Sequence, residues 1–64
     1  MELSRTEYNN LIEEWIFNER DRAIMKRRIL DGITYEKLAE EFEMSVRGVK
    51  YIVDRNRHIL QKHI

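Results

Sequence analysis

The chemistry available to this 64-residue sequence lies mainly in its basic side chains, which gather towards the end of the chain. Residues 44–64 hold a single acid, Asp54, and five basic side chains, namely Arg47, Lys50, Arg55, Arg57 and Lys62. Such groups contact phosphates, and an arginine can also bond both acceptors on the edge of a guanine. Residues 1–21 carry six acids and two arginines, so the zero net charge conceals two opposite ends. This asymmetry can mark a surface that faces a polyanion, although for charge alone a solvated surface is the more common explanation.

The residues from about 45 to 62 are predicted to form a helix that sorts these side chains onto one face. Ser45 is a suitable N-cap, and apolar residues follow it at helical spacing, namely Val49, Ile52, Val53, Ile59 and Leu60. Arg47, Lys50 and Tyr51 fall opposite this stripe. The first residues of a recognition helix face base edges in the major groove of DNA. We therefore expect Arg47 to bind guanine, Lys50 to bind guanine or phosphate, and Tyr51 to bind phosphate or a thymine methyl group.

The elements that position this helix are also predicted to be helical. The chain has 2 Gly and 0 Pro, so it contains few residues that break helices. Candidate N-caps precede three apolar patterns, at Ser4, Asn18 and Thr34. They indicate helices over about 4–17 and 19–31, and a helix-turn-helix over about 33–53 whose last helix continues to about 62. We expect an all-α, four-helix domain that occupies residues 1–64.

Several function classes are excluded by what the sequence lacks. With 0 Cys there is no disulfide and no thiolate site. His58 and His63 lie about 140° apart around a helix, so they do not share a ligand face. We find no catalytic or phosphate-loop motif, and therefore expect no enzyme, no metal and no cofactor. No apolar run approaches the roughly 20 residues of a membrane span and no signal peptide is recognisable, so we expect a cytoplasmic protein.

Residues 31–45, which read DGITYEKLAEEFEMS, carry a family resemblance together with Val49 and Lys50. This segment closely resembles region 4 of sigma-70-type RNA polymerase sigma factors. It is also similar to the small stand-alone proteins of bacteria and phages that are like this region. The resemblance extends over residues 18–62 and implies sequence-specific binding of double-stranded DNA in transcription regulation, with RNA polymerase as a candidate partner.

The resemblance also implies roles for particular residues. The helix before the helix-turn-helix would hold the DNA backbone through Arg27 or Arg28, with help from Thr34 and Tyr35. The recognition positions of the family correspond here to Ser45, Arg47, Gly48, Lys50, Tyr51 and Arg55. Gly48 admits two interpretations, a close approach of the helix backbone to DNA or close packing within the protein.

Two features depart from the family pattern. Glu43 stands in the turn where the family usually has Gly, a position that permits positive φ. Glutamate adopts such a conformation only with strain, and it places an acid near the expected phosphate path. These 64 residues also leave no room for the domain that melts promoters, so if they are the full protein we do not expect a complete sigma factor.

A protein-binding adaptor is the alternative from another functional class. The first predicted helix is acidic and carries an apolar stripe of Tyr8, Leu11, Ile12, Trp15 and Ile16. Trp15 is expected to anchor the core, whereas Phe17 falls beside the stripe and could contact a partner. That partner would be RNA polymerase or a second copy of the chain, since helix-turn-helix proteins often bind DNA as dimers.

Overall fold

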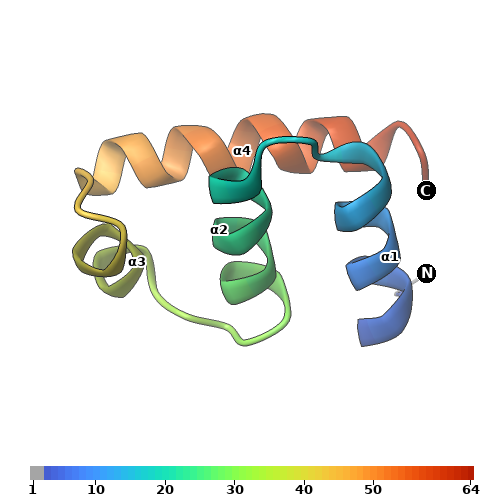
Figure 1. Ribbon diagram of the computed structural model, residues 1–64, viewed down its shortest axis with the longest axis horizontal. Helices are drawn as coiled ribbons and strands as arrows, with labels where there is room; N and C mark the ends of the chain where they lie inside the picture. The colour runs from blue at the N-terminus through green and yellow to red at the C-terminus, as the bar shows by residue number, and fades with distance from the viewer. Residues whose placement is uncertain (1–2) are drawn as a thin grey trace.

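Four helices build the part of the chain that the computed structural model describes, residues 3–64 (Figure 1). They are α1 (Arg5–Trp15), α2 (Glu19–Ile29), α3 (Tyr35–Glu41) and α4 (Val46–Gln61). No strand occurs among the described residues. The long α4 runs along one side of the molecule, and the three shorter helices lie next to one another beneath it. The expected all-α, four-helix fold with a helix-turn-helix formed by α3 and α4 is confirmed.

All four predicted N-cap residues do precede a helix. Each helix begins after a side chain whose oxygen accepts a hydrogen bond from a backbone amide in the first turn, at Ser4, Asn18, Thr34 and Ser45. At α1 the capping box is complete, because the Glu7 carboxylate also accepts from the Ser4 amide at 3.0 Å. That bond lowers the pKa of Glu7. Local side-chain chemistry therefore fixes where all four helices start.

The helix ends differ from prediction by one or two residues. α1 ends at Trp15 instead of residue 17, because Ile16 has an extended backbone, with φ −111° and ψ 110°, that turns the chain towards α2. Phe17 consequently leaves the helix and is 77% exposed. α2 ends at Ile29 rather than 31, and α4 ends at Gln61 rather than 62.

Two turns require left-handed backbone, and one of them is occupied by an acid. Gly32 has φ 67° after α2, as expected of a glycine that stops a helix. Glu43 has φ 53° after α3, so this position does have the positive φ that the family's glycine would permit. The Glu43 and Met44 amides donate to the carbonyls of Glu40 and Ala39 at 3.3 and 2.9 Å, the Schellman pattern that closes a helix. The fold thus retains a glycine-type turn despite the steric cost to glutamate.

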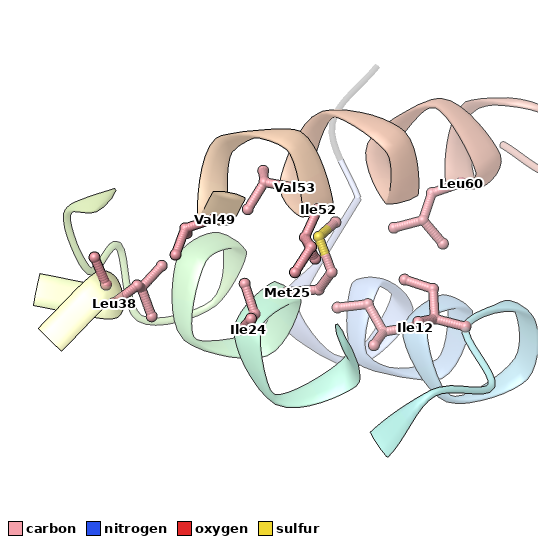
Figure 2. Close-up of a cluster of buried hydrophobic side chains, with 10 residues drawn as sticks. Ile12, Ile24, Met25, Leu38, Val49, Ile52, Val53 and Leu60 are labelled. Atoms are coloured by element: carbon pink, nitrogen blue, oxygen red, sulfur yellow. The ribbon is translucent and has the colours of Figure 1, made fainter. Parts of the chain in front are cut away.

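The core lies where α1, α2 and α3 meet the inner face of α4 (Figure 2). Its buried apolar residues are Ile12, Ile16, Ile24, Met25, Leu38, Ala39, Val49, Ile52, Val53 and Leu60. The four core residues that α4 contributes all belong to its predicted stripe, and the fifth residue of that stripe, Ile59, is half-buried. Met25 of α2 is fully buried, because α2 packs against α1, α3 and α4.

Trp15 occupies the edge of this core rather than its centre. It is half-buried and packs against the apolar cluster. Its indole stacks on the imidazole of His63, with ring centroids 3.6 Å apart and an interplanar angle of 2°. This contact ties the end of the chain back to α1. Among residues 3–64 no helix has the length and apolar character needed to cross a membrane.

Candidate nucleic-acid interface

Three of the predicted DNA-binding residues meet at one aromatic ring. The guanidinium carbon of Arg28 lies 4.4 Å from the centroid of the Tyr35 ring, and the Lys50 Nζ lies 5.8 Å from it. Arg28 comes from α2, Tyr35 from α3 and Lys50 from α4, so tertiary structure brings them together. We call Arg28, Tyr35 and Lys50 the tyrosine cluster. Cation–π attraction holds the two positive groups at the same surface without neutralising either.

The turn between α2 and α3 places the ring. The Ile33 amide donates to the Arg27 carbonyl at 3.1 Å, which folds the chain back under the end of α2. The Thr34 hydroxyl accepts from the Lys37 amide at 3.2 Å, so α3 begins at Tyr35. Arg28 in turn donates from Nη1 to the Ile33 carbonyl at 3.0 Å. Thr34 therefore has a capping role that fixes the ring beside Arg28 and Lys50.

The start of α4 continues this surface. Ser45 caps the helix by accepting from the Gly48 amide at 3.0 Å. Arg47, Lys50 and Tyr51 are all exposed, and the Tyr51 side chain is 64% accessible. Within residues 3–64, neither Arg47 nor Lys50 forms an ion pair with an acid. Two cations one turn apart are thus available to an external anion.

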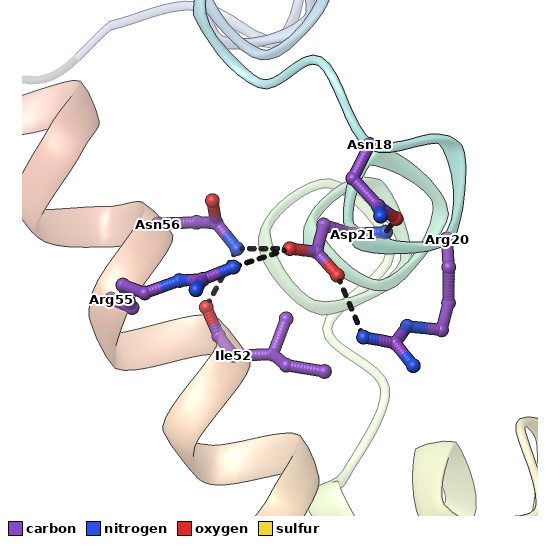
Figure 3. Close-up of polar contacts among 6 residues, drawn as sticks. All are labelled: Asn18, Arg20, Asp21, Ile52, Arg55 and Asn56. Atoms are coloured by element: carbon purple, nitrogen blue, oxygen red, sulfur yellow. Dashed lines mark hydrogen bonds and ion pairs between the residues drawn. The ribbon is translucent and has the colours of Figure 1, made fainter.

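Arg55, also predicted as a DNA contact, is turned towards the protein. Its Nη2 donates to the Asp21 carboxylate of α2 at 3.0 Å (Figure 3). Its guanidinium carbon also lies 5.8 Å from the centroid of the Tyr51 ring. Arg55 is about 140° from Lys50 around the helix, and so lies on the other flank of α4. The structure does not bring it to the tyrosine cluster.

A buried polar cluster around Asp21 explains this orientation. The Asp21 side chain is 2% exposed and also accepts from Asn56 Nδ2 at 3.2 Å and from Arg20 at 3.4 Å. Asn56 is buried as well and donates to the Ile52 carbonyl at 2.8 Å. Our sequence reasoning missed this cluster. Its signal was Asn56 itself, a polar residue within the apolar arc of α4, because buried polar groups require partners.

The structure also distinguishes Arg27 from Arg28. Arg27 donates through Nε and Nη2 to the two carboxylate oxygens of Glu41 at 2.9 and 2.7 Å, and Asp31 lies 3.6 Å from its Nη1. These hydrogen bonds lower the pKa of Glu41. Arg27 therefore pairs with Glu41 of α3 and with Asp31, which follows α2, whereas Arg28 belongs to the tyrosine cluster.

A side chain at residue 48 would fit tightly against two side chains that precede α4. A Cβ atom on Gly48 would lie 3.2 Å from the Ser45 Oγ and 3.3 Å from the Met44 Cε. Both distances are tighter than ordinary van der Waals contact. The packing interpretation of Gly48 thus has a structural basis in the turn before α4.

Comparison with known proteins leaves the family open. No family model matches the chain, and neither a curated protein nor a solved structure matches it. The resemblance to sigma region 4 therefore remains a prediction that rests on the residues of this sequence. In the described part of the chain, His, Asp and Glu side chains form no group of three suited to a metal ion.

Proposed function

We propose that this domain binds double-stranded DNA in transcription regulation, with the first half of α4 in the major groove. The observation that carries the proposal is the meeting of the half-buried Arg28 and Tyr35 with the exposed Lys50, which lies one helical turn from the exposed Arg47. Cations are costly to gather at one place unless acids or anions balance them. Here the face of the Tyr35 ring attracts the two cations only weakly, so both positive charges can still attract an external anion.

The positions of these side chains suit different contacts, with Arg28 at a phosphate and Arg47 and Lys50 at base edges. Arg28 is braced by the Ile33 carbonyl and the Tyr35 ring, so its remaining N–H groups could hold a phosphate in a fixed place. Arg47 and Lys50 project from the first two turns of α4, the part of a recognition helix that reaches base edges. Tyr51 is exposed beside them and can donate its hydroxyl hydrogen to a phosphate.

A second candidate function has its own observation in its favour. Phe17 is 77% exposed between α1 and α2, with the acids Glu14 and Glu19 close to it in sequence. An exposed aromatic side chain in an acidic setting suits a protein partner with a basic, apolar surface. This adaptor function would use RNA polymerase or another protein in place of DNA.

Fluorescence anisotropy with a random-sequence duplex tests the proposal. We expect binding that weakens roughly 40-fold between about 50 and 200 mM salt if about three phosphates are contacted. The variant with both Arg47→Ala and Lys50→Ala should keep its helicity and lose measurable affinity. Lys62→Ala is the matched control for Lys50→Ala, because it removes the same charge from the opposite end of α4 and should change affinity much less.

The result that would overturn the proposal is equally definite. Non-specific complexes have Kd values of about 10⁻⁴ to 10⁻⁶ M. Absence of binding across this range at the lower salt concentration would exclude the DNA surface. Phe17→Ser would then be tested for loss of binding to purified RNA polymerase, with Tyr51→Ser, the same change at another exposed aromatic residue, as the control.

A further inference from the structure

A groove of about 530 Å³ lies where α1, the end of α2 and the end of α4 meet. Tyr8, Ile29, Leu60 and Ile64 form its apolar lining, and Arg28 and Arg57 supply its charge. Leu60 is almost fully buried at its base, whereas Ile64 is 62% exposed. The volume falls in the range of small-molecule sites, about 300–1,000 Å³. This groove is on a different part of the molecule from Arg47 and the start of α4.

The charged residues that line the groove are all basic. Among the described residues that line it, two are arginines and none is an acid. Arg57 forms no ion pair within residues 3–64. Arg28 is held by the Ile33 carbonyl and the Tyr35 ring, so its guanidinium has a defined position without an acidic partner. In the described part of the chain, the groove is therefore lined by two arginines and no acid, next to apolar side chains.

We propose that this groove binds a small amphipathic carboxylate, an organic acid with an aliphatic or aromatic tail. A carboxylate matches the planar donor pattern of a guanidinium. The tail would cover Ile29 and Leu60, and its burial would supply the larger part of the affinity. A bare phosphate would leave the apolar lining in water, and a neutral hydrocarbon would leave both arginines without an anion.

The groove shares Arg28 with the tyrosine cluster, which gives the ligand a regulatory consequence that rests on the proposed function. A carboxylate bonded to Arg28 would compete with a DNA phosphate for the same donors. Saturation with the ligand should then weaken DNA binding by several fold. Binding of the ligand itself needs no DNA, so failure of the DNA proposal would leave the groove proposal intact.

Titration of the ¹⁵N-labelled chain with decanoate, followed by NMR, provides the test. We expect saturable shifts of the amides of Gly32, Gln61 and Ile64, which line the groove. Decanol has the same tail without the charge, and acetate has the charge without the tail. Both should bind at least about tenfold more weakly, since each lacks one of the two interactions.

Variants outside the core keep the result interpretable. Arg57→Gln should weaken decanoate about tenfold, because a hydrogen bond to a charged group is lost, and Arg57→Lys should restore part of the affinity. Ile64→Glu places an acid at the exposed mouth and should abolish binding. Lys62→Gln removes a nearby charge that does not line the groove and should have no effect. Equal affinity for decanol, equal effects of Arg57→Gln and Lys62→Gln, or no saturable shift would each overturn the proposal.

Discussion

The basic side chains on the two flanks of α4 differ in whether the protein supplies them with an acidic partner. On one flank Arg55 bonds to the buried Asp21 at 3.0 Å. On the other flank Lys50 has only the face of Tyr35, which it shares with Arg28. The same contrast separates two adjacent residues of α2, since Arg27 is held by Glu41 in a bidentate manner and Arg28 is not.

This contrast shows that basic composition alone does not identify a binding surface. Arg55 and Arg28 are both among the contact positions that the resemblance to sigma region 4 implies, yet Arg55 bonds to a buried carboxylate of the protein. A cation with an internal acid has already lost much of its attraction for an external anion. The positive groups without acidic partners mark the surface with which an anion can interact.

The largest expected effect comes from removing Asp21, the acid that pairs with Arg55 on one flank of α4. Asp21→Ala removes one of the two acceptors of the buried Asn56 Nδ2 and leaves Arg55 without its partner, so we expect a loss of about 2–3 kcal/mol in the free energy of unfolding. For a domain of this size that corresponds to a fall in Tm of roughly 10–20 °C. Urea unfolding followed by circular dichroism would measure it. A loss below about 1 kcal/mol would show that the cluster does not stabilise the fold.

Two single substitutions, one on each flank of α4, compare the flanks directly. Arg55→Gln should cost about 1 kcal/mol of stability, because it removes a charged hydrogen bond to Asp21 from a side chain that is itself half-exposed. Lys50→Gln should change stability by less than about 0.5 kcal/mol. DNA affinity should respond in the opposite order, with the larger loss in Lys50→Gln. Equal effects of both changes on stability would remove the distinction between the flanks.

The smallest effect is expected at the exposed pair next to the tyrosine cluster. Hydrogen bonds from Arg27 lower the pKa of Glu41 in the folded protein. Their stabilisation is therefore complete above the pKa of glutamate in the unfolded chain, about 4.3, and is lost as the pH falls through the lower folded value. Glu41→Gln should lower the Tm slightly at neutral pH and not at pH 2.

Glu40→Gln provides the control for that measurement. Glu40 is exposed on the same helix and forms no ion pair within residues 3–64. Its substitution should leave the dependence of Tm on pH close to that of the unmodified chain. A difference between Glu41→Gln and the unmodified chain that persists at pH 2 would contradict the ion-pair explanation.

Local features of the sequence were sufficient to predict the helices. The four N-caps, the glycine at residue 32 and the apolar spacing of α4 each act within a few residues, so pattern reasoning reaches them. The left-handed turn at Glu43 was predictable only through the resemblance, because glutamate itself gives no signal for positive φ. The early end of α1 was missed, since Ile16 and Phe17 continue the apolar pattern of the helix.

The site was predicted less well than the fold because its contacts join distant parts of the chain. Arg55 and Asp21 are 34 residues apart, and nothing near either residue indicates that they meet. The choice between Arg27 and Arg28 depended on where α3 places Glu41 and Tyr35. The groove between α1, α2 and α4 likewise exists only after the helices pack. Periodicity assigns a side chain to a face, but packing decides what that face contacts.

The stacking of Trp15 on His63 has an optical consequence. Trp15 is the single tryptophan of the chain, so the indole emission of the protein comes from one known position. Release of the last few residues would remove the imidazole from the indole and alter the emission while the four helices remain folded. Ile64, the residue after His63, lines the groove, so a ligand that moves the end of the chain should change the indole emission without an added dye.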